Sequence, residues 1–221
     1  MHAYYYERLL KAGLRLKYAL STQSKFDFVR MAATGRSLFV GEGNLSFSLE
    51  IARHLETFER ARLVASTFES AHEWSDETVS NARQLIELGC TVLDQIDARS
   101  IDRHFGTGVF DFVGFQFPNV GSRQPKHGRN PNHVLLRRFL KSAANAISQH
   151  GAICVTTINS PYYDGAFSID DAARWAGLPK PVAYRFDPDD YAEYFHANTL
   201  DQSTSAIGST EDFVTFVFRK A

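Results

Sequence analysis

The stretch that decides the fold reads Leu38-Phe39-Val40-Gly41-Glu42-Gly43-Asn44-Leu45-Ser46. Three apolar residues predict a short buried strand, and two glycines allow a tight turn in which the backbone can approach a ligand closely. A helical pattern of apolar residues then starts at Leu45. A glycine pair alone also serves turns that bind nothing, so any cofactor must be inferred from what surrounds this turn.

Outward from the turn, strand and helix patterns alternate. Strands are expected at residues 38–40, 62–67, 91–93, 110–115, 152–157, 181–186 and 213–218, and helices at residues 45–55, 78–88, 133–148 and 169–176. This rhythm predicts an α/β fold with a doubly wound, mostly parallel sheet whose last two strands form a hairpin-like pair.

The chain is expected to divide into two parts. Leucines at roughly helical spacing within residues 4–20 suggest an amphipathic helix, so residues 1–34 are expected to form an N-terminal helical extension. Residues 35–221 are expected to form one Rossmann-like domain. An apolar content of 44% with 13% aromatic residues is enough for a substantial core.

Charge is unevenly distributed along a nearly neutral chain. The formal net charge is −1, yet residues 112–163 contain no acidic residue and carry +6, which leaves −7 for the remainder. The six cations are Arg123, Lys126, Arg129, Arg137, Arg138 and Lys141. Such a segment can attract an anionic partner such as RNA, although helix charges often form only a solvated face.

Several classes of protein are disfavoured by missing patterns. Cys90 and Cys154 lie in apolar runs, which argues against a disulfide or a cysteine zinc site, and the histidines form no metal-binding array. The sequence contains no Walker loop and no G-x-S-x-G elbow. Without a signal-peptide core or a membrane-spanning stretch, a cytoplasmic protein is expected.

The residues around the glycine turn favour S-adenosylmethionine over a dinucleotide. Ser46 stands where the dinucleotide fingerprint has its third glycine, and S-adenosylmethionine has no phosphate to be packed there. Acids after the second and third strands can accept hydrogen bonds from a ribose and an adenine amino group. The expected cofactor-binding residues are Gly41, Glu42, Gly43, Asn44, Ser46, Glu69 and Asp97. Alternatively, Asn44 and Asp97 are helix caps, and Glu42 and Glu69 are solvated acids.

A second candidate site follows the fourth strand, at Phe115-Gln116-Phe117-Pro118-Asn119-Val120-Gly121. An aromatic turn with a side-chain amide can hold a flat ring and align a ring nitrogen for methylation, although aromatic residues after a strand are more often core. The expected catalytic residues are Gln116, Phe117, Pro118, Asn119 and Asp164. The expected substrate-binding residues are Phe115, Arg123, Lys126, Arg129 and Tyr163.

The Gly-Glu-Gly-x-x-Ser-Phe-Ser string at residues 41–48, the Asp97-Ala98 pair and the 110–121 segment resemble the Rossmann-like ribosomal RNA (uridine-N3)-methyltransferases. The resemblance covers nearly everything after Gly35. It implies a seven-stranded class I methyltransferase sheet with an antiparallel final strand, S-adenosylmethionine as cofactor and methyl transfer to a ring nitrogen.

The sequence departs from that family where the acceptor would lie. Asn44 replaces the usual aspartate, Gln116 the usual asparagine before Phe-Pro, and Asn119 the usual histidine after it. The acceptor therefore stays open between uridine in ribosomal RNA and a small heterocyclic metabolite. A noncatalytic RNA-binding module and, because of the Rossmann rhythm alone, a nicotinamide oxidoreductase are the alternatives from other classes. Tyr163, Asp164 and His127 are the candidates for a base.

Overall fold

The computed structural model describes residues 24–121, 124–125, 128–192, 194 and 212–221. These residues form a seven-stranded sheet of order β3-β2-β1-β4-β5-β7-β6. The strands are β1 (Ser37–Phe39), β2 (Leu63–Ser66), β3 (Thr91–Leu93), β4 (Phe110–Gln116), β5 (Ile147–Ile158), β6 (Val182–Phe186) and β7 (Phe213–Arg219). The first five pair in parallel, whereas β7 pairs antiparallel with both β5 and β6. The predicted fold class is confirmed.

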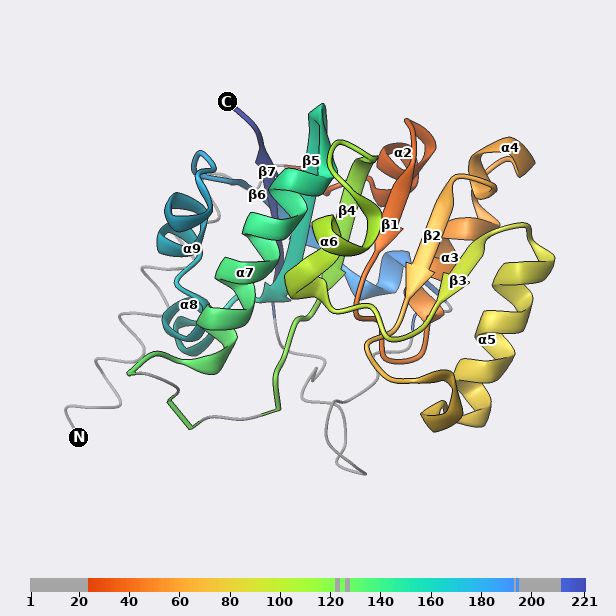
Figure 1. Cartoon of the computed structure of the whole chain (residues 1–221), viewed down its shortest axis with the longest axis horizontal. Coiled ribbons are helices and arrows are strands. Elements are labelled where there is room, and N and C mark those ends of the chain that lie inside the picture. The colour runs from red at the N-terminus through yellow and green to blue at the C-terminus, as the bar shows by residue number, and fades with distance from the viewer. Residues whose placement is uncertain (1–23, 122–123, 126–127, 193, 195–211) are drawn as a thin grey trace.

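Helices cover both faces of the sheet. Figure 1 shows α6, α7 and α9 on the viewer's side of the sheet and α2 and α3 behind it. The helices are α2 (Phe28–Ala33), α3 (Ser46–Arg53), α4 (Thr57–Arg60), α5 (Asp76–Glu87), α6 (Ile101–Phe105), α7 (Pro131–Ala146), α8 (Pro161–Phe167) and α9 (Ile169–Ala176). The described residues also form the 3-10 turns η1 (Ala71–Glu73), η2 (Ala98–Ser100) and η3 (Pro188–Asp190). The helix predicted within residues 4–20 lies outside the described residues.

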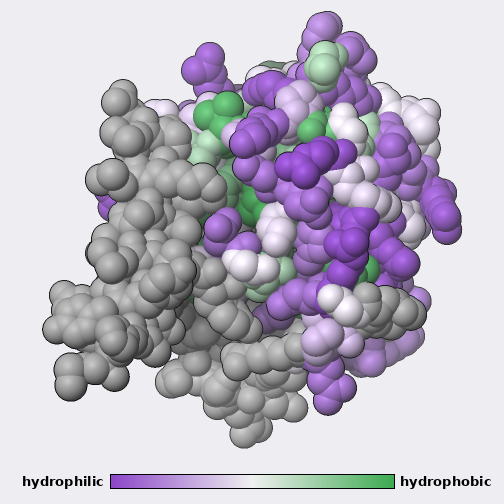
Figure 2. Space-filling view, turned by 90° about the vertical axis from the view of Figure 1, so that its left-hand side faces the viewer, coloured by the Kyte–Doolittle hydropathy of each residue, from purple (hydrophilic) through white to green (hydrophobic). Residues whose placement is uncertain are grey.

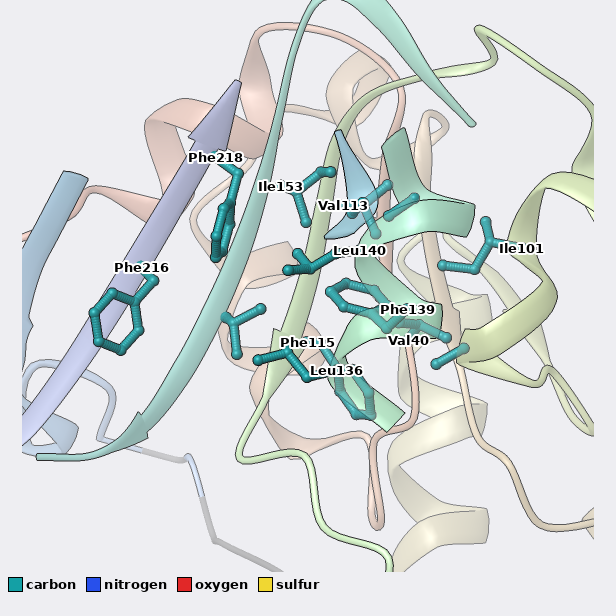
Figure 3. Close-up of a cluster of buried hydrophobic side chains, with 14 of the residues drawn as sticks. Val40, Ile101, Val113, Phe115, Leu136, Phe139, Leu140, Ile153, Phe216 and Phe218 are labelled. Atoms are coloured by element: carbon teal, nitrogen blue, oxygen red, sulfur yellow. The ribbon is translucent and has the colours of Figure 1, made fainter. Parts of the chain in front are cut away.

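The central strands are buried on both faces, which explains their continuous apolar runs. Every residue of β1 and β2 is buried, and so are the last eight residues of β5. On one face, Figure 3 shows side chains of α7 such as Leu136 and Phe139 gathered with residues of β4, β5 and β7. On the other face, α2, α3 and α5 cover a second apolar cluster. The two apolar clusters, one on each face of the sheet, hold the ends of the strands in position.

Helix α2, which no sequence pattern predicted, joins that second cluster. The Asp27 side chain accepts a hydrogen bond from Arg30 N–H and caps the helix. Phe28 is completely buried and meets Phe39 and Phe47 with ring centroids 6.5 and 5.1 Å away. The end of the predicted 1–34 extension therefore contributes to the sheet's core, while the boundary at residue 34 stays a prediction.

The junction of α7 and β5 differs from the expected boundary. The helix ends at Ala146 rather than near residue 148, and β5 starts at Ile147, five residues earlier than expected. Phe110 pairs with Ile147 and Phe112 with Ala152, so three extra residues bulge out of β5. The polar sequence of this bulge also fits a helix surface, which explains why the pattern extended the helix too far.

Among the described residues on the side that Figure 2 presents, polar side chains predominate, and apolar residues appear as small patches between them. None of the helices in the described ranges has the length and apolar character needed to cross a membrane. In the same ranges, no three or more His, Cys, Asp and Glu side chains are grouped to hold a metal ion.

Candidate functional site

A cavity of about 500 Å³ opens at the carboxyl ends of the parallel strands. It lies where the strand order reverses, with β1 between β2 and β4, which is the usual ligand position in open α/β sheets. Its lining residues are Gly41, Glu42, Gly43, Asn44, Phe47, Phe68, Glu69, Ile96, Asp97, Ala98, Arg99, Phe115, Gln116, Phe117, Asn119, Val120, Leu135 and Tyr194. Segments far apart in the sequence thus share one pocket.

Both the backbone conformation at position 41 and the neighbouring side chain require glycine there. Its φ is +68°, and a Cβ at this position would lie 2.8 Å from the Phe115 ring. Because L-residues disfavour this conformation and the ring leaves no room, glycine is the residue that fits. The turn can therefore pass directly beneath the cavity.

Glu42 is buried, with 7% of its surface exposed, so the solvated-acid alternative is wrong for this residue. Its carboxylate accepts hydrogen bonds from the backbone N–H of Ser48 at 3.3 Å and from Ser48 Oγ at 2.9 Å. Burial raises the pKa of Glu42 to about 7, and the bonds from Ser48 oppose that rise. A buried carboxyl on the cavity wall is well suited to meet a cationic ligand group.

Helix α3 begins one residue later than expected. Leu45, with a φ of +64°, is the N-cap residue, and the side chain of Asn44 accepts hydrogen bonds from the N–H and Oγ of Ser46. The alternative that Asn44 is the N-cap residue is therefore wrong by one position: Leu45 is the N-cap, and Asn44 bonds Ser46 from the residue before it. Asn81 of α5 donates to the Asn44 carbonyl at 2.9 Å and so ties α5 to the turn.

Asp97 lies across the cavity at the end of the segment after β3. It is the N-cap residue of η2 and accepts from Arg99 N–H at 2.8 Å, so the expected capping role is confirmed. The guanidinium of Arg99 also contacts both carboxylate oxygens at 2.7–3.0 Å and lowers the pKa of Asp97. Asp97 is therefore an ionised acceptor at neutral pH.

Residues that follow β2 and β3 line the same side of the cavity as Asp97. Phe68, 55% exposed, and the exposed Glu69 line the cavity next to the buried Ile96. A flat ring can lie between such apolar side chains while a carboxylate bonds a ribose or an amino group. No sequence pattern predicted Phe68 as a site residue, apart from its position after a predicted strand.

The turn after β4 forms the opposite wall. Gln116 is the last residue of β4, and Phe117 adopts a φ of +46° while its N–H donates to the Thr156 carbonyl at 2.9 Å. Asn119 lines the cavity, and its side chain accepts from Gly121 N–H at 3.0 Å. A non-glycine residue held at positive φ is strained, and such strain is concentrated at functional sites.

Tyr194 is a cavity residue that the sequence patterns did not reveal. Its ring lies 6.4 Å from the Phe117 ring, with an angle of 12° between their planes, and 5.2 Å from the Phe47 ring. Burial raises the pKa of Tyr194, and the nearby Glu42 carboxylate raises it further. The residue lies in an irregular polar stretch of the sequence, which offers no pattern that predicts a site residue.

Some predicted site residues lie elsewhere. Ser46 bonds Asn44 behind the turn, and Pro118 is buried without lining the cavity. Tyr163 and Asp164 line a separate small pocket beside β5 and β7, and Arg129 is exposed and lines neither pocket. Arg123, Lys126 and His127 lie outside the described residues. The predicted roles of all these residues remain untested predictions.

This fold, with its strand order, glycine turn and cavity, defines a class I methyltransferase. A sequence model named BMT5-like, described as rRNA (uridine-N3-)-methyltransferase BTM5-like, matches residues 38–198. The chain belongs to this family, and it is a methyltransferase.

Individual relatives and solved structures are only distantly similar to this chain in sequence. The uncharacterized protein At4g26485 of Arabidopsis thaliana is 28% identical over 74% of this chain and 81% of its own length. The mouse ferredoxin-fold anticodon-binding domain-containing protein 1 homolog is 28% identical over 55% of this chain, which spans only 19% of that protein. The structure of NSun6 from Pyrococcus horikoshii with SFG has a TM-score of 0.51 at 13% identity, covering 87% of this chain and 50% of that one. The methyltransferase CalH with SAH has a TM-score of 0.50 at 13% identity, covering 87% and 53%. These likenesses support the fold.

Proposed function

We propose that this protein transfers a methyl group from S-adenosylmethionine to a ring nitrogen of a uracil-like base, with N3 of uridine in ribosomal RNA as the leading acceptor, in the cytoplasm. The observation that carries the proposal is the one cavity shared by the Gly41–Asn44 turn, Asp97 and the Gln116–Asn119 turn. Residues expected to bind the methyl donor and residues expected to bind the methyl acceptor thus line the same cavity. The family's description names the same reaction and acceptor.

The residues of one wall fit the donor. The turn at Gly41 brings the backbone close to the cavity. The buried Glu42 carboxyl suits the ammonium group in the methionine part of S-adenosylmethionine. Asp97 suits the adenine amino group and Glu69 a ribose hydroxyl, between the apolar Phe68 and Ile96. The two structures of other proteins that contain SAH and SFG, ligands related to this donor, support the assignment by fold alone.

The protein's task is to position the acceptor. S-adenosylmethionine supplies a methyl group already activated on a sulfonium, so no protein nucleophile is required. The Gln116–Asn119 turn holds the acceptor ring with its nitrogen in line with the methyl carbon. The nitrogen gives up its proton to solvent and bonds the methyl carbon, while the electron pair of the broken C–S bond stays on sulfur.

An RNA acceptor is supported by exposed cations on α7, the helix that also contributes to the cavity wall. Leu135 of α7 lines the cavity, and Arg138 and Lys141 follow it on the exposed face of the same helix. Arg137 of α7 places its guanidinium 4.3 Å from the ring centre of Trp175, which is 49% exposed on α9. Cations and an accessible aromatic ring are what phosphates and unpaired bases require.

The experiment compares two classes of acceptor. Purified protein with labelled S-adenosylmethionine is incubated with ribosomal RNA, and separately with uracil and related small heterocycles. Label in RNA that digests to N3-methyluridine is expected. Label in a small heterocycle but not in RNA would replace the RNA assignment with the metabolite alternative, and no label in either would contradict the proposed reaction.

A further inference from the structure

The side-chain amide of Gln116 is buried at the cavity wall without a hydrogen-bond partner. Neither Nε2 nor Oε1 has one within the part of the chain that the structure describes, although both atoms are inaccessible to solvent. Buried amides are almost always paired, because an unpaired one destabilises the folded state. Since no group in the described ranges satisfies this amide, a ligand of the cavity is the natural partner.

The neighbouring rings are arranged for a flat ligand. Phe117, the next residue, and Tyr194 both line the cavity, and their ring planes differ by only 12°. Phe186 and Phe213 meet the Phe117 ring edge-on at 5.8 and 5.5 Å and fix its orientation. The amide thus lies beside two rings that present their faces in nearly the same direction.

Backbone strain occurs at the same place. The positive φ of Phe117 redirects the chain directly after Gln116, while the bond from Phe117 N–H to Thr156 keeps the turn anchored to β5. An unpaired amide and a strained residue side by side both reduce the stability of the ligand-free protein. A protein retains such features where a bound ligand makes use of them.

We propose that the Gln116 amide is the group that recognises the acceptor: its Nε2–H donates to a ring carbonyl next to the reacting nitrogen, with the acceptor ring packed against Phe117 and Tyr194. This rests on the proposed function and specifies the acceptor as a ring with a lactam or imide edge. When the ring nitrogen loses its proton, negative charge spreads onto that carbonyl oxygen. The bond from Nε2 therefore stabilises the ring anion, and with it the transition state, relative to the neutral ring, and so accelerates methyl transfer.

The test uses Gln116→Met, which keeps the chain length and removes both polar atoms. The ligand-free variant is expected to melt roughly 2–4 °C higher than wild type, because an unpaired buried amide is gone. Methylation of a uridine-containing RNA is expected to fall by about 100-fold or more, as on removing one donor to a developing oxyanion. Affinity for S-adenosylhomocysteine should not change, since the donor wall is untouched.

Gln84→Met is the matched control. Gln84 of α5 is also a partly buried amide, but its Oε1 accepts from Arg53 at 2.9 Å. The same substitution there should lower the melting temperature and leave methylation unchanged. Gln116→Asn, which keeps an amide on a shorter side chain, should recover part of the lost rate.

Two results would overturn the inference. One is a Gln116→Met protein that melts lower than wild type, as the control does, because the amide would then be structural. The other is equal binding of a short oligouridylate by wild type and Gln116→Met, both loaded with S-adenosylhomocysteine, where about 10-fold weaker binding is expected. Failure of the proposed function itself would appear differently, as wild-type protein that neither binds S-adenosylmethionine nor methylates RNA.

Discussion

Ser48 donates two hydrogen bonds to the carboxylate of Glu42, one from its backbone N–H at 3.3 Å and one from Oγ at 2.9 Å. These bonds join the first turn of α3 to the glycine turn and hold an otherwise buried acid at the cavity wall. Burial still dominates and leaves the pKa of Glu42 at about 7, against an ordinary value of 4.5. The protonation of this one group therefore links pH, stability and donor binding.

The ligand-free protein is expected to lose stability through Glu42 as the pH rises from 4.5 to 7. In this window the folded state binds the Glu42 proton more tightly than the unfolded state, so the stabilising effect of that proton is complete below pH 4.5 and is lost toward pH 7. The loss is at most about 3 kcal/mol. Glu42→Gln should flatten this part of the curve in urea unfolding experiments. Identical pH dependence in both proteins would show that Glu42 titrates normally.

Donor binding is expected to release a proton from Glu42 near pH 7. A cationic ammonium beside the carboxyl lowers its pKa, so the affinity for S-adenosylmethionine should rise by up to about 10-fold from pH 6 to pH 8. Calorimetry in two buffers with different ionisation enthalpies measures the proton release. Glu42→Gln should show none. An affinity that falls with rising pH would separate Glu42 from the ammonium.

Gly41→Ala is expected to weaken donor binding by at least 10-fold, because the new Cβ meets the Phe115 ring and must displace the turn. The positive φ alone should destabilise the fold by about 1–2 kcal/mol. Gly89→Ala is the matched control, since Gly89 has a φ of +91° with nothing within 4 Å of an added Cβ. It should lose similar stability and keep its affinity for S-adenosylmethionine, measured by calorimetry. Equal affinities for all three proteins would place the turn outside the donor site.

Asp97→Asn is expected to lower the affinity for S-adenosylmethionine by roughly 10-fold, because a charged acceptor for the adenine amino group is lost. Arg99→Ala should not lower it, since that change frees the carboxylate oxygens that Arg99 now contacts. Competition with adenosine reads the adenine part separately. If Arg99→Ala weakens binding more than Asp97→Asn, the guanidinium rather than the carboxylate is the binding group.

Charge reversal on α7 is expected to weaken RNA binding without affecting the donor. Arg138→Glu combined with Lys141→Glu should lower RNA affinity by at least 10-fold at low salt and reduce the salt dependence, because fewer counterions are released. Arg83→Glu, on the exposed surface of α5, is the control and should change RNA affinity little. Filter binding at several salt concentrations measures both. An unchanged salt dependence in the double variant would show that RNA binds to another surface of the protein.

Local sequence patterns were sufficient for the sheet. The apolar runs at 38–40 and 110–115 could be read directly because parallel strands are buried on both faces, and the glycines marked the turn between β1 and α3. Helix α2 was missed because six residues with one buried phenylalanine show too few periods to be recognised. The bulge in β5 was missed because its register depends on its partner strand β4.

The candidate site was only partly accessible from the sequence. Residues at or just after the ends of strands, such as Gln116 and Asp97, could be placed together because the carboxyl ends of parallel strands share one edge. Asp164 was chosen by its position in the chain, yet it lies in another pocket, because α8 carries it away from the sheet edge. Tyr194 enters the cavity by tertiary packing against Phe47 and Phe117, which no local pattern reveals.

The most direct test of the central claim is methyl transfer by the purified protein to RNA, followed by nucleoside mass spectrometry. Wild-type protein with S-adenosylmethionine is expected to produce N3-methyluridine in ribosomal RNA, and Gly41→Ala should produce at least 10-fold less at a limiting donor concentration. Protein that binds S-adenosylmethionine but leaves every uridine unmodified, while methylating another base or a small heterocycle, would contradict the assignment of the acceptor.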